Sequence, residues 1–518
     1  MLLFKKMNMK NIVKNLLIGG FVITLMVSCD NFLDVNEDPN NPLAVTVNPE
    51  IVLAATQVYT YNVLAGTSVP DNPNVIQDNM NQLGNLMMNN WTRDVGASNS
   101  SYYFNEHTYN VTSDFYSGIF ENLFLRTANY TFIQQTERPG YDNYKAIAKI
   151  LKSYYFQYLV DMYGDIPYSQ AHLRGDNLTP AYDDDLAIYR DLYVQLDQAI
   201  ALIDNAPAGS LSPAANDVML HGDMAMWKKF ANTVKLRLLL RESQRAASAS
   251  YITTKMTELQ TSGAQFLGPN DNVKINPGFS ATANQQNGFA STFLTTNDTF
   301  KNNWSSTGAT KYTTSYLLAT NDNRIGRIYS ATSAGPGTYD GHVQGDVLST
   351  ATNYPVSHVG PGLLVNSAQD GIVFTAAESL LLQAEAVQRG YLSGSAQALY
   401  ESAITESYKL LGLTAGQATT YYSQFVNLVG WTASSNKIEA IINQKWIALN
   451  GINGGESWIE NTRTGYPAHV PLSPVRPGSV TTRPVRLLYP SSEIAGNTAN
   501  VPPQTEAQAF TSRVFWNQ

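Results

Sequence analysis

Residues 373–411 read VFTAAESLLLQAEAVQRGYLSGSAQALYESAITESYKLL, and this stretch decides the fold. Apolar residues recur three and four positions apart in both halves, which is the pattern of amphipathic helices that each bury one face. The halves are separated by the link from Gly390 to Gly394, and glycine commonly ends a helix. We therefore predict a hairpin of two helices, over 373–389 and 396–411.

The second predicted helix carries Ala396, Tyr400 and Ala403. This spacing is similar to the small–aromatic–small signature in the second helix of a tetratricopeptide repeat. Small side chains let paired helices approach each other closely, and the aromatic ring fills the groove between them. The same helical period recurs at 142–163, 186–202, 227–241 and 437–449. We predict a mainly α fold, with a scaffold of about four tetratricopeptide-like helical hairpins, long irregular loops and little β-structure.

Two groups of charged residues in these helices have both a structural and a functional interpretation. Asp183, Asp184 and Asp185 precede the helix at 186–202 and could hold a metal ion. Acidic residues at this position more often cap a helix and interact with its positive N-terminal dipole. The basic side of the helix at 227–241 is expected to be a solvated face. We therefore predict neither a metal site nor a cofactor.

Two long segments, near 70–113 and 263–366, have a different character. They are rich in Asn, Thr, Ser and Gly and show no sustained hydrophobic period. Loops of this length inside a compact protein are usually functional. We predict that both belong to a single α-helical domain over 49–518 and build its ligand face.

The chemistry of these loops favours a ligand with hydroxyl groups. Aromatic rings pair with the C–H face of a sugar, while Arg and Asp side chains hydrogen-bond to hydroxyls. The same surface suits an oligopeptide, and each ring taken alone could instead pack its loop against the body of the protein. The candidate ligand-binding residues are Trp91, Arg93, Asp94, Tyr102, Tyr103, Trp304, Tyr312 and Tyr339.

Composition and motifs exclude several other functions. Charged residues make up 14% of the 518 residues and the formal net charge is −8, which argues against a nucleic-acid partner. A single Cys rules out a disulfide framework and a Cys-based zinc site. The catalytic patterns G-x-S-x-G, H-E-x-x-H and the P-loop are absent from the sequence. We predict a binding protein and no enzyme, with a surface glycan hydrolase and a protein-binding adaptor as the alternatives.

The N-terminus has the pattern of an export signal. Lysines at 5, 6, 10 and 14 precede an apolar run over 16–27, which is too short to cross a bilayer. The run ends at Cys29, the sole cysteine, in a setting that resembles a bacterial lipobox with Met26 in place of the usual Leu. We predict a lipoprotein signal peptide over 1–28, lipidation of Cys29, a tether over 29–48, and attachment to a membrane through the lipid anchor.

Several motifs, in this order along the chain, together resemble the SusD/RagB family of outer-membrane lipoproteins of the Bacteroidetes type. The resemblance implies a cell-surface protein that caps a TonB-dependent, SusC-like transporter. Such a protein captures nutrient oligomers and passes them on without cleaving them. It also implies that the ligand loops fall near 91–109 and 304–339. The motifs are FLDVN at 32–36, DMYGDIPY at 161–168, WKKFAN at 227–232, KIEAIINQKW at 437–446 and RTGYP at 463–467.

Overall fold

The computed structural model describes residues 47–66, 79–97, 101–173, 176–346 and 355–517. The chain separates into two units, 1–49 and 50–518. The predicted signal peptide, Cys29 and most of the predicted tether lie outside the described residues, as do parts of both long loops. Within the described ranges, no helix is both long and apolar enough to cross a membrane.

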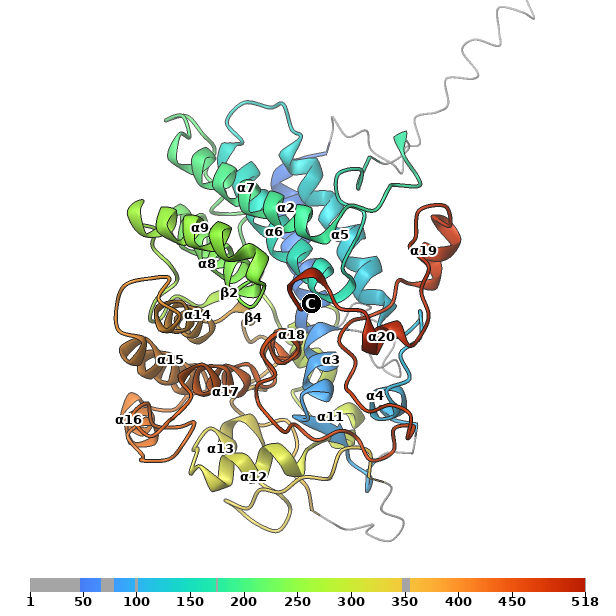
Figure 1. Ribbon diagram of the computed structural model, residues 1–518, viewed down its shortest axis with the longest axis vertical. Coiled ribbons are helices and arrows are strands. Elements are labelled where there is room, and N and C mark those ends of the chain that lie inside the picture. The colour runs from blue at the N-terminus through green and yellow to red at the C-terminus, as the bar shows by residue number, and fades with distance from the viewer. Residues whose placement is uncertain (1–46, 67–78, 98–100, 174–175, 347–354, 518) are drawn as a thin grey trace, which may run out of the picture. The chain divides into compact units, whose positions relative to one another are not determined.

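The prediction of a mainly α fold is confirmed, and the described residues contain only four short strands. Four helix pairs form the scaffold, and successive pairs contact one another through α6 and α7, α8 and α14, and α14 and α17. Figure 1 shows α7, α9, α14, α15 and α16 following one another on the left of the view. The pairs are α5 (Ser117–Gln134) with α6 (Asp142–Tyr163), α7 (Asp185–Asp204) with α8 (Met224–Arg241), α14 (Ala376–Gln388) with α15 (Ala396–Leu410), and α17 (Lys437–Leu449) with α18 (Gly454–Thr464).

The remaining α-helices and the loops between them complete the unit. They are α2 (Pro49–Ala65), α3 (Met80–Met87), α4 (Phe104–Thr108), α9 (Ala249–Thr261), α10 (Gly288–Phe293), α11 (Asn302–Ser306), α12 (Lys311–Ala319), α13 (Ile325–Ile328), α16 (Ala415–Tyr422), α19 (Ser491–Gly496) and α20 (Gln508–Thr511).

The hairpin of α14 and α15 forms for the reasons that its sequence suggests. The side chain of Thr375 accepts a hydrogen bond from the Glu378 amide and begins α14, and Ser395 begins α15 in the same way. Tyr400 and Ala403 are fully buried between the helices. The Tyr400 hydroxyl donates to the Val429 carbonyl at 2.9 Å, so the ring also holds the segment that follows α16.

The prediction that a helix begins at Val373 is wrong. Val373 and Phe374 belong to strand β4 (Gly371–Phe374), which pairs antiparallel with β2 (Val273–Ile275). A short apolar run can form either a strand or a buried helix, and here pairing with a distant segment decides between them. The second sheet joins β1 (Trp91–Arg93) to β3 (Thr307–Ala309), also antiparallel.

The expected solvated face of the helix at 227–241 is also wrong in part, because Arg237 and Arg241 are fully buried. They belong to a set of charges between α6, α8, α14, α17 and α18, which we call the buried ion network. Arg241 Nη2 lies 2.7 Å from Glu456 Oε2, and burying such charges is tolerable only when they are paired. The network consists of Arg237, Arg241, Lys445 and Arg463 with Asp161, Glu378, Glu385, Glu456 and Glu460, and none of these side chains is more than 3% exposed.

Two carboxyl groups of the network, those of Glu378 and Asp161, have a raised pKa. Burial raises the pKa of Glu378 to about 7, although Lys445 and Arg237 act in the opposite direction. Its Oε2 atom is buried without a hydrogen-bond partner among the described residues. By contrast, the pKa of Glu456 is lowered, because the charges of Arg241 and Lys445 outweigh its burial. The pKa of Glu378 therefore lies close to neutral pH, well above that of an ordinary glutamate.

The first long loop is fixed to this scaffold through α3. A Cβ atom on Gly84 would lie 1.8 Å from the Gly454 carbonyl carbon, so α3 and α18 cross at a distance that only glycine permits. Asn81 strengthens the crossing, since its amide donates to the Gly451 carbonyl and its oxygen accepts from the Gly454 amide, both at 2.9 Å. The chain leaves α3 and enters β1, so the scaffold sets the position of the strand.

Candidate functional site

The two loop segments that were expected to form a ligand face meet in the sheet of β1 and β3. Trp91 is opposite Ala309, and Arg93 is opposite Thr307. Residues more than two hundred positions apart are therefore held side by side by backbone hydrogen bonds. This pairing brings Arg93 and Asp94 to the stretch that follows Trp304.

Two of the candidate rings, Trp91 and Tyr103, do not face solvent, because each is only 2% exposed. Trp91 packs edge-on against Phe293, with 5.9 Å between ring centroids. The Tyr103 hydroxyl bonds to Thr307 Oγ1 at 2.9 Å. The expectation that these rings offer an open stacking surface is not met, because both rings bury apolar area that orders their loops. Tyr102 is half-buried and leans on Tyr103, with their centroids 4.4 Å apart.

Arg93 and Asp94 lie at the end of β1 and are also largely buried. Arg93 Nη2 donates to the Asp346 carbonyl at 3.2 Å, and burial lowers its pKa. Asp94 Oδ1 lies 3.5 Å from His342 Nε2, and Oδ2 lies 3.7 Å from His358 Nε2. Burial alone would raise the pKa of Asp94, but these histidines and the Gly96 amide outweigh it and lower the pKa. Asp94 is therefore an anchored carboxylate.

A stacked pair of aromatic rings, of which Phe300 is exposed and Trp304 half-buried, is joined to this carboxylate through His358. Phe300 and Trp304 are stacked with centroids 3.9 Å apart and an interplanar angle of 14°, and Phe300 is 56% exposed. The Trp304 indole donates to the Val359 carbonyl at 2.8 Å, and its ring lies 4.4 Å from the His358 ring. We call Phe300, Trp304, His358 and Asp94 the Phe300–Trp304 platform.

Phe300 is not among the residues that the sequence analysis singles out. Its spacing of four residues from Trp304 was the available signal, since aromatic residues at that spacing often lie on the same side of the chain. The platform therefore combines one predicted ring, one predicted carboxylate and two residues that were not predicted.

The two remaining candidates lie elsewhere. Tyr312 is half-buried on α12 with its ring 5.5 Å from that of Trp446, and burial raises its pKa to about 12. Tyr339 is half-buried as well, and its hydroxyl would be 2.5 Å from a Cβ atom on Gly326. Both tyrosines thus keep one side packed against neighbouring helices.

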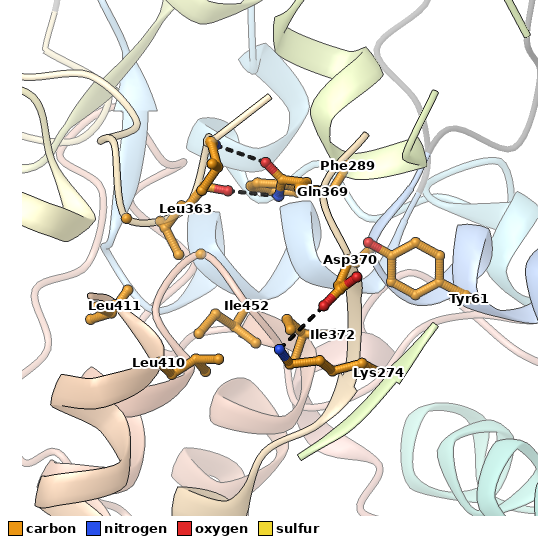
Figure 2. Close-up of a pocket in the computed structure, with 14 residues that line it drawn as sticks. Tyr61, Lys274, Phe289, Leu363, Gln369, Asp370, Ile372, Leu410, Leu411 and Ile452 are labelled. Atoms are coloured by element: carbon orange, nitrogen blue, oxygen red, sulfur yellow. Dashed lines mark hydrogen bonds and ion pairs between the residues drawn. The ribbon is translucent and has the colours of Figure 1, made fainter. Parts of the chain in front are cut away.

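A cavity of about 180 Å³ opens between α2, the β2–β4 sheet and the end of α15. Figure 2 shows that its walls are mainly apolar, with Leu363, Leu410, Leu411 and Ile452 on one side and Tyr61 on the other. The one ion pair is formed by Lys274 and Asp370, whose charged atoms are 3.2 Å apart. The residues that line this cavity can make apolar contacts with a ligand. As the structure describes them, they do not include a nucleophile placed beside a base.

Among the described residues, one group of three acids is close enough to suggest a metal site, namely Asp165, Asp184 and Asp185. Asp184 caps α7, as the sequence predicts, whereas Asp165 was not predicted. Asp183 instead accepts hydrogen bonds from the Tyr168 and Ser169 amides. Asp184 accepts a hydrogen bond from the Ala187 amide, and Asp165 accepts one from the Asp185 amide, both at 2.9 Å. The helix cap accounts for this group of charges.

The comparisons with known proteins agree with this architecture. A sequence model of the SusD-like family, described as starch-binding and associating with the outer membrane, matches residues 62–490. No protein with a curated description matches the sequence.

Solved structures share the fold at low sequence identity. A chitin-binding SusD homolog from Flavobacterium johnsoniae is 23% identical, with a TM-score of 0.70 over 90% of this chain and 98% of that one. A SusD homolog from Bacteroides fragilis is 20% identical, with a TM-score of 0.70 over 91% and 100%. Another from Bacteroides vulgatus is 19% identical, with a TM-score of 0.72 over 89% and 97%.

Proposed function

Because the chain belongs to the SusD-like family of starch-binding proteins that associate with the outer membrane, we propose that it is a surface-exposed lipoprotein for nutrient uptake. It binds nutrient oligomers, with oligosaccharides as the favoured ligand, and delivers them uncleaved to a TonB-dependent transporter. Lipidation of Cys29 holds it at the outer membrane. The chitin-binding relative from Flavobacterium supports a glycan ligand.

The observation that carries the choice of ligand is the Phe300–Trp304 platform. Phe300 presents a largely exposed ring that is backed by the Trp304 indole, so little conformational entropy is lost when a sugar stacks on it. Asp94 accepts hydrogen bonds, and sugar hydroxyls donate them. Each such contact contributes little, so affinity for a single sugar unit is low.

Retention then depends on the length of the ligand. A polymer offers many equivalent units to one platform, and rebinding of neighbouring units raises the effective concentration. The platform combines a ring for stacking with an anchored carboxylate that accepts hydrogen bonds, and this combination suits the capture of a sugar chain.

The experiment is isothermal titration of the full chain with chitin and starch oligosaccharides of two to eight units, beside a peptide series of matched length. We expect affinity to rise with glycan length and to fall about tenfold in Phe300→Ala. Phe425→Ala is the matched control, because Phe425 is 86% exposed and lies outside the platform. Equal affinity for monosaccharides and octasaccharides, or binding of peptides alone, would reject the proposal.

The membrane part of the proposal has its own test. Cys29→Ala should move the protein from the membrane fraction to the soluble fraction, and mass spectrometry should find acyl chains on the mature wild-type N-terminus. An unacylated mature chain that remains with the membrane would exclude the lipid anchor and leave glycan capture intact.

A further inference from the structure

A second concave site lies between three segments that are distant in sequence. A groove of about 830 Å³ is enclosed by α4 with the residues that follow it up to Val111, by the segment 475–482 and by the region around α20. Figure 1 shows α4 and α20 on the same side of the unit. Ligand sites usually measure some 300–1,000 Å³, so the groove has room for several sugar units. We call it the C-terminal groove.

One wall of the groove carries an exposed aromatic ring on a firm base. Phe104 is 54% exposed and is the first residue of α4. The preceding residue, Tyr103, is buried and bonds to Thr307 in β3, so the backbone beneath Phe104 is tied to the β1–β3 sheet. Phe510 and Val480 add apolar area to the facing walls. The ring is thus presented by fixed structure.

Most polar groups that line the groove are neutral hydroxyls that can hydrogen-bond to a ligand. The hydroxyl groups of Ser479, Thr481 and Thr482 line it and form no hydrogen bond with any described residue. Glu506 is the one charged side chain in its lining as the structure describes it. These hydroxyls both donate and accept, and the carboxylate accepts, which matches the hydroxyl groups of a sugar.

Two arginines near the groove, Arg476 and Arg483, already donate hydrogen bonds to backbone carbonyls, so these donors are not offered to an anionic ligand. Arg476 Nε donates to the Val480 carbonyl at 2.7 Å, and Arg483 Nη2 donates to the Pro471 carbonyl at 3.0 Å. An acidic ligand would therefore meet Glu506 without a compensating charge. The described lining also has no strand edge, which an extended peptide would need for backbone pairing. Both observations favour a neutral oligosaccharide.

We propose that the C-terminal groove is a second binding site for neutral oligosaccharides, distinct from the Phe300–Trp304 platform. The two sites share no lining residue, yet Tyr103 joins them, since it precedes Phe104 and bonds to Thr307, three residues beyond Trp304. A chain long enough to reach both sites would bind with avidity, and a short one would occupy them independently.

The test uses the full chain with chitin and starch hexasaccharides that carry a photoreactive group at one end. After irradiation, mass spectrometry of the wild type should find label in peptides covering 475–482 as well as in those around Phe300. Phe104→Ala should lower labelling of the 475–482 peptide at least fivefold and leave labelling near Phe300 unchanged. Phe300→Ala should do the reverse, and Phe425→Ala should change neither.

A second variant tests the groove with a substitution that should not disturb folding. Glu506→Gln keeps the shape of the groove and its hydrogen-bonding capacity, so it should retain labelling of 475–482 with a neutral hexasaccharide. It should gain labelling with a hexasaccharide of uronic acids, because the repulsive carboxylate is gone. Label confined to the Phe300 region in every variant would overturn the groove and keep the proposed function. Label confined to 475–482 would keep the groove and overturn the platform.

Discussion

The buried ion network and the Phe300–Trp304 platform use their side chains in opposite ways. In the network, nine ionisable side chains are removed from water and paired with one another, although Glu378 Oε2 has no hydrogen-bond partner among the described residues. On the platform, an apolar ring is left 56% exposed while the nearby carboxylate is anchored by histidines. The comparison teaches that the scaffold buries its charges in pairs, whereas the platform leaves an apolar ring in contact with solvent.

The largest effect should come from breaking the network. Arg241→Met removes the partner of Asp161, Glu456 and Glu460 and leaves buried carboxylates uncompensated. We expect a loss of about 3–5 kcal/mol in the free energy of unfolding, measured by urea denaturation. Lys228→Met, which breaks an exposed pair with Asp204, is the control and should cost less than about 1 kcal/mol. Similar losses in both variants would show that the network is not the stabilising feature.

A smaller effect should appear as a dependence of stability on pH. The pKa of Glu378 in the folded protein, about 7, lies above its ordinary value of 4.5. Between these values the folded chain keeps a proton that the unfolded chain loses, so this group lowers stability as pH rises from about 5 to about 8. In Glu378→Gln, the free energy of unfolding should fall between pH 5 and pH 8 by on the order of 2 kcal/mol less than in the wild type. An unchanged slope in urea denaturation at several pH values would contradict this assignment.

A milder change should loosen the platform without unfolding it. Trp304→Phe keeps a ring against Phe300 but deletes the hydrogen bond to the Val359 carbonyl. We expect a loss of about 1 kcal/mol in stability and a threefold to fivefold loss of oligosaccharide affinity in calorimetric titration. Full affinity in this variant would mean that Phe300 does not depend on the indole for its position.

The smallest effect is expected at a ring that the sequence singled out. Trp91 is buried, and its indole nitrogen has no hydrogen-bond partner among the described residues. Trp91→Phe should therefore change oligosaccharide affinity less than twofold, because the ring packs against Phe293 and does not reach a ligand. A tenfold loss with unchanged thermal stability would place Trp91 in the site after all.

The sequence predicts the scaffold better than the site, for a physical reason. The spans of α6 and α17 follow from local periodicity, and the structure places them at the predicted residues, 142–163 and 437–449. The burial of Arg237 and Arg241 depends on carboxylates from other helices, so their helix alone resembles a solvated face.

The same limit applies to the aromatic residues of the loops. Trp91 and Phe300 both lie in polar segments without a sustained period, so the local pattern does not tell which ring is packed and which is exposed. Trp91 is packed by a long-range partner, Phe293, whereas Phe300 stacks on Trp304 only four residues away and stays exposed. The region of the face could therefore be predicted, while most of its contact residues could not.

The pairing of β1 with β3 also bears on how ligand preference can be altered. Its register, from Trp91 opposite Ala309 to Arg93 opposite Thr307, is held by main-chain atoms. Because this pairing does not depend on side chains, the side chains of the neighbouring stretch 294–306 can be exchanged without breaking the β1–β3 sheet. Grafting that stretch from a relative with another preference offers a compact route to a redesigned sugar receptor.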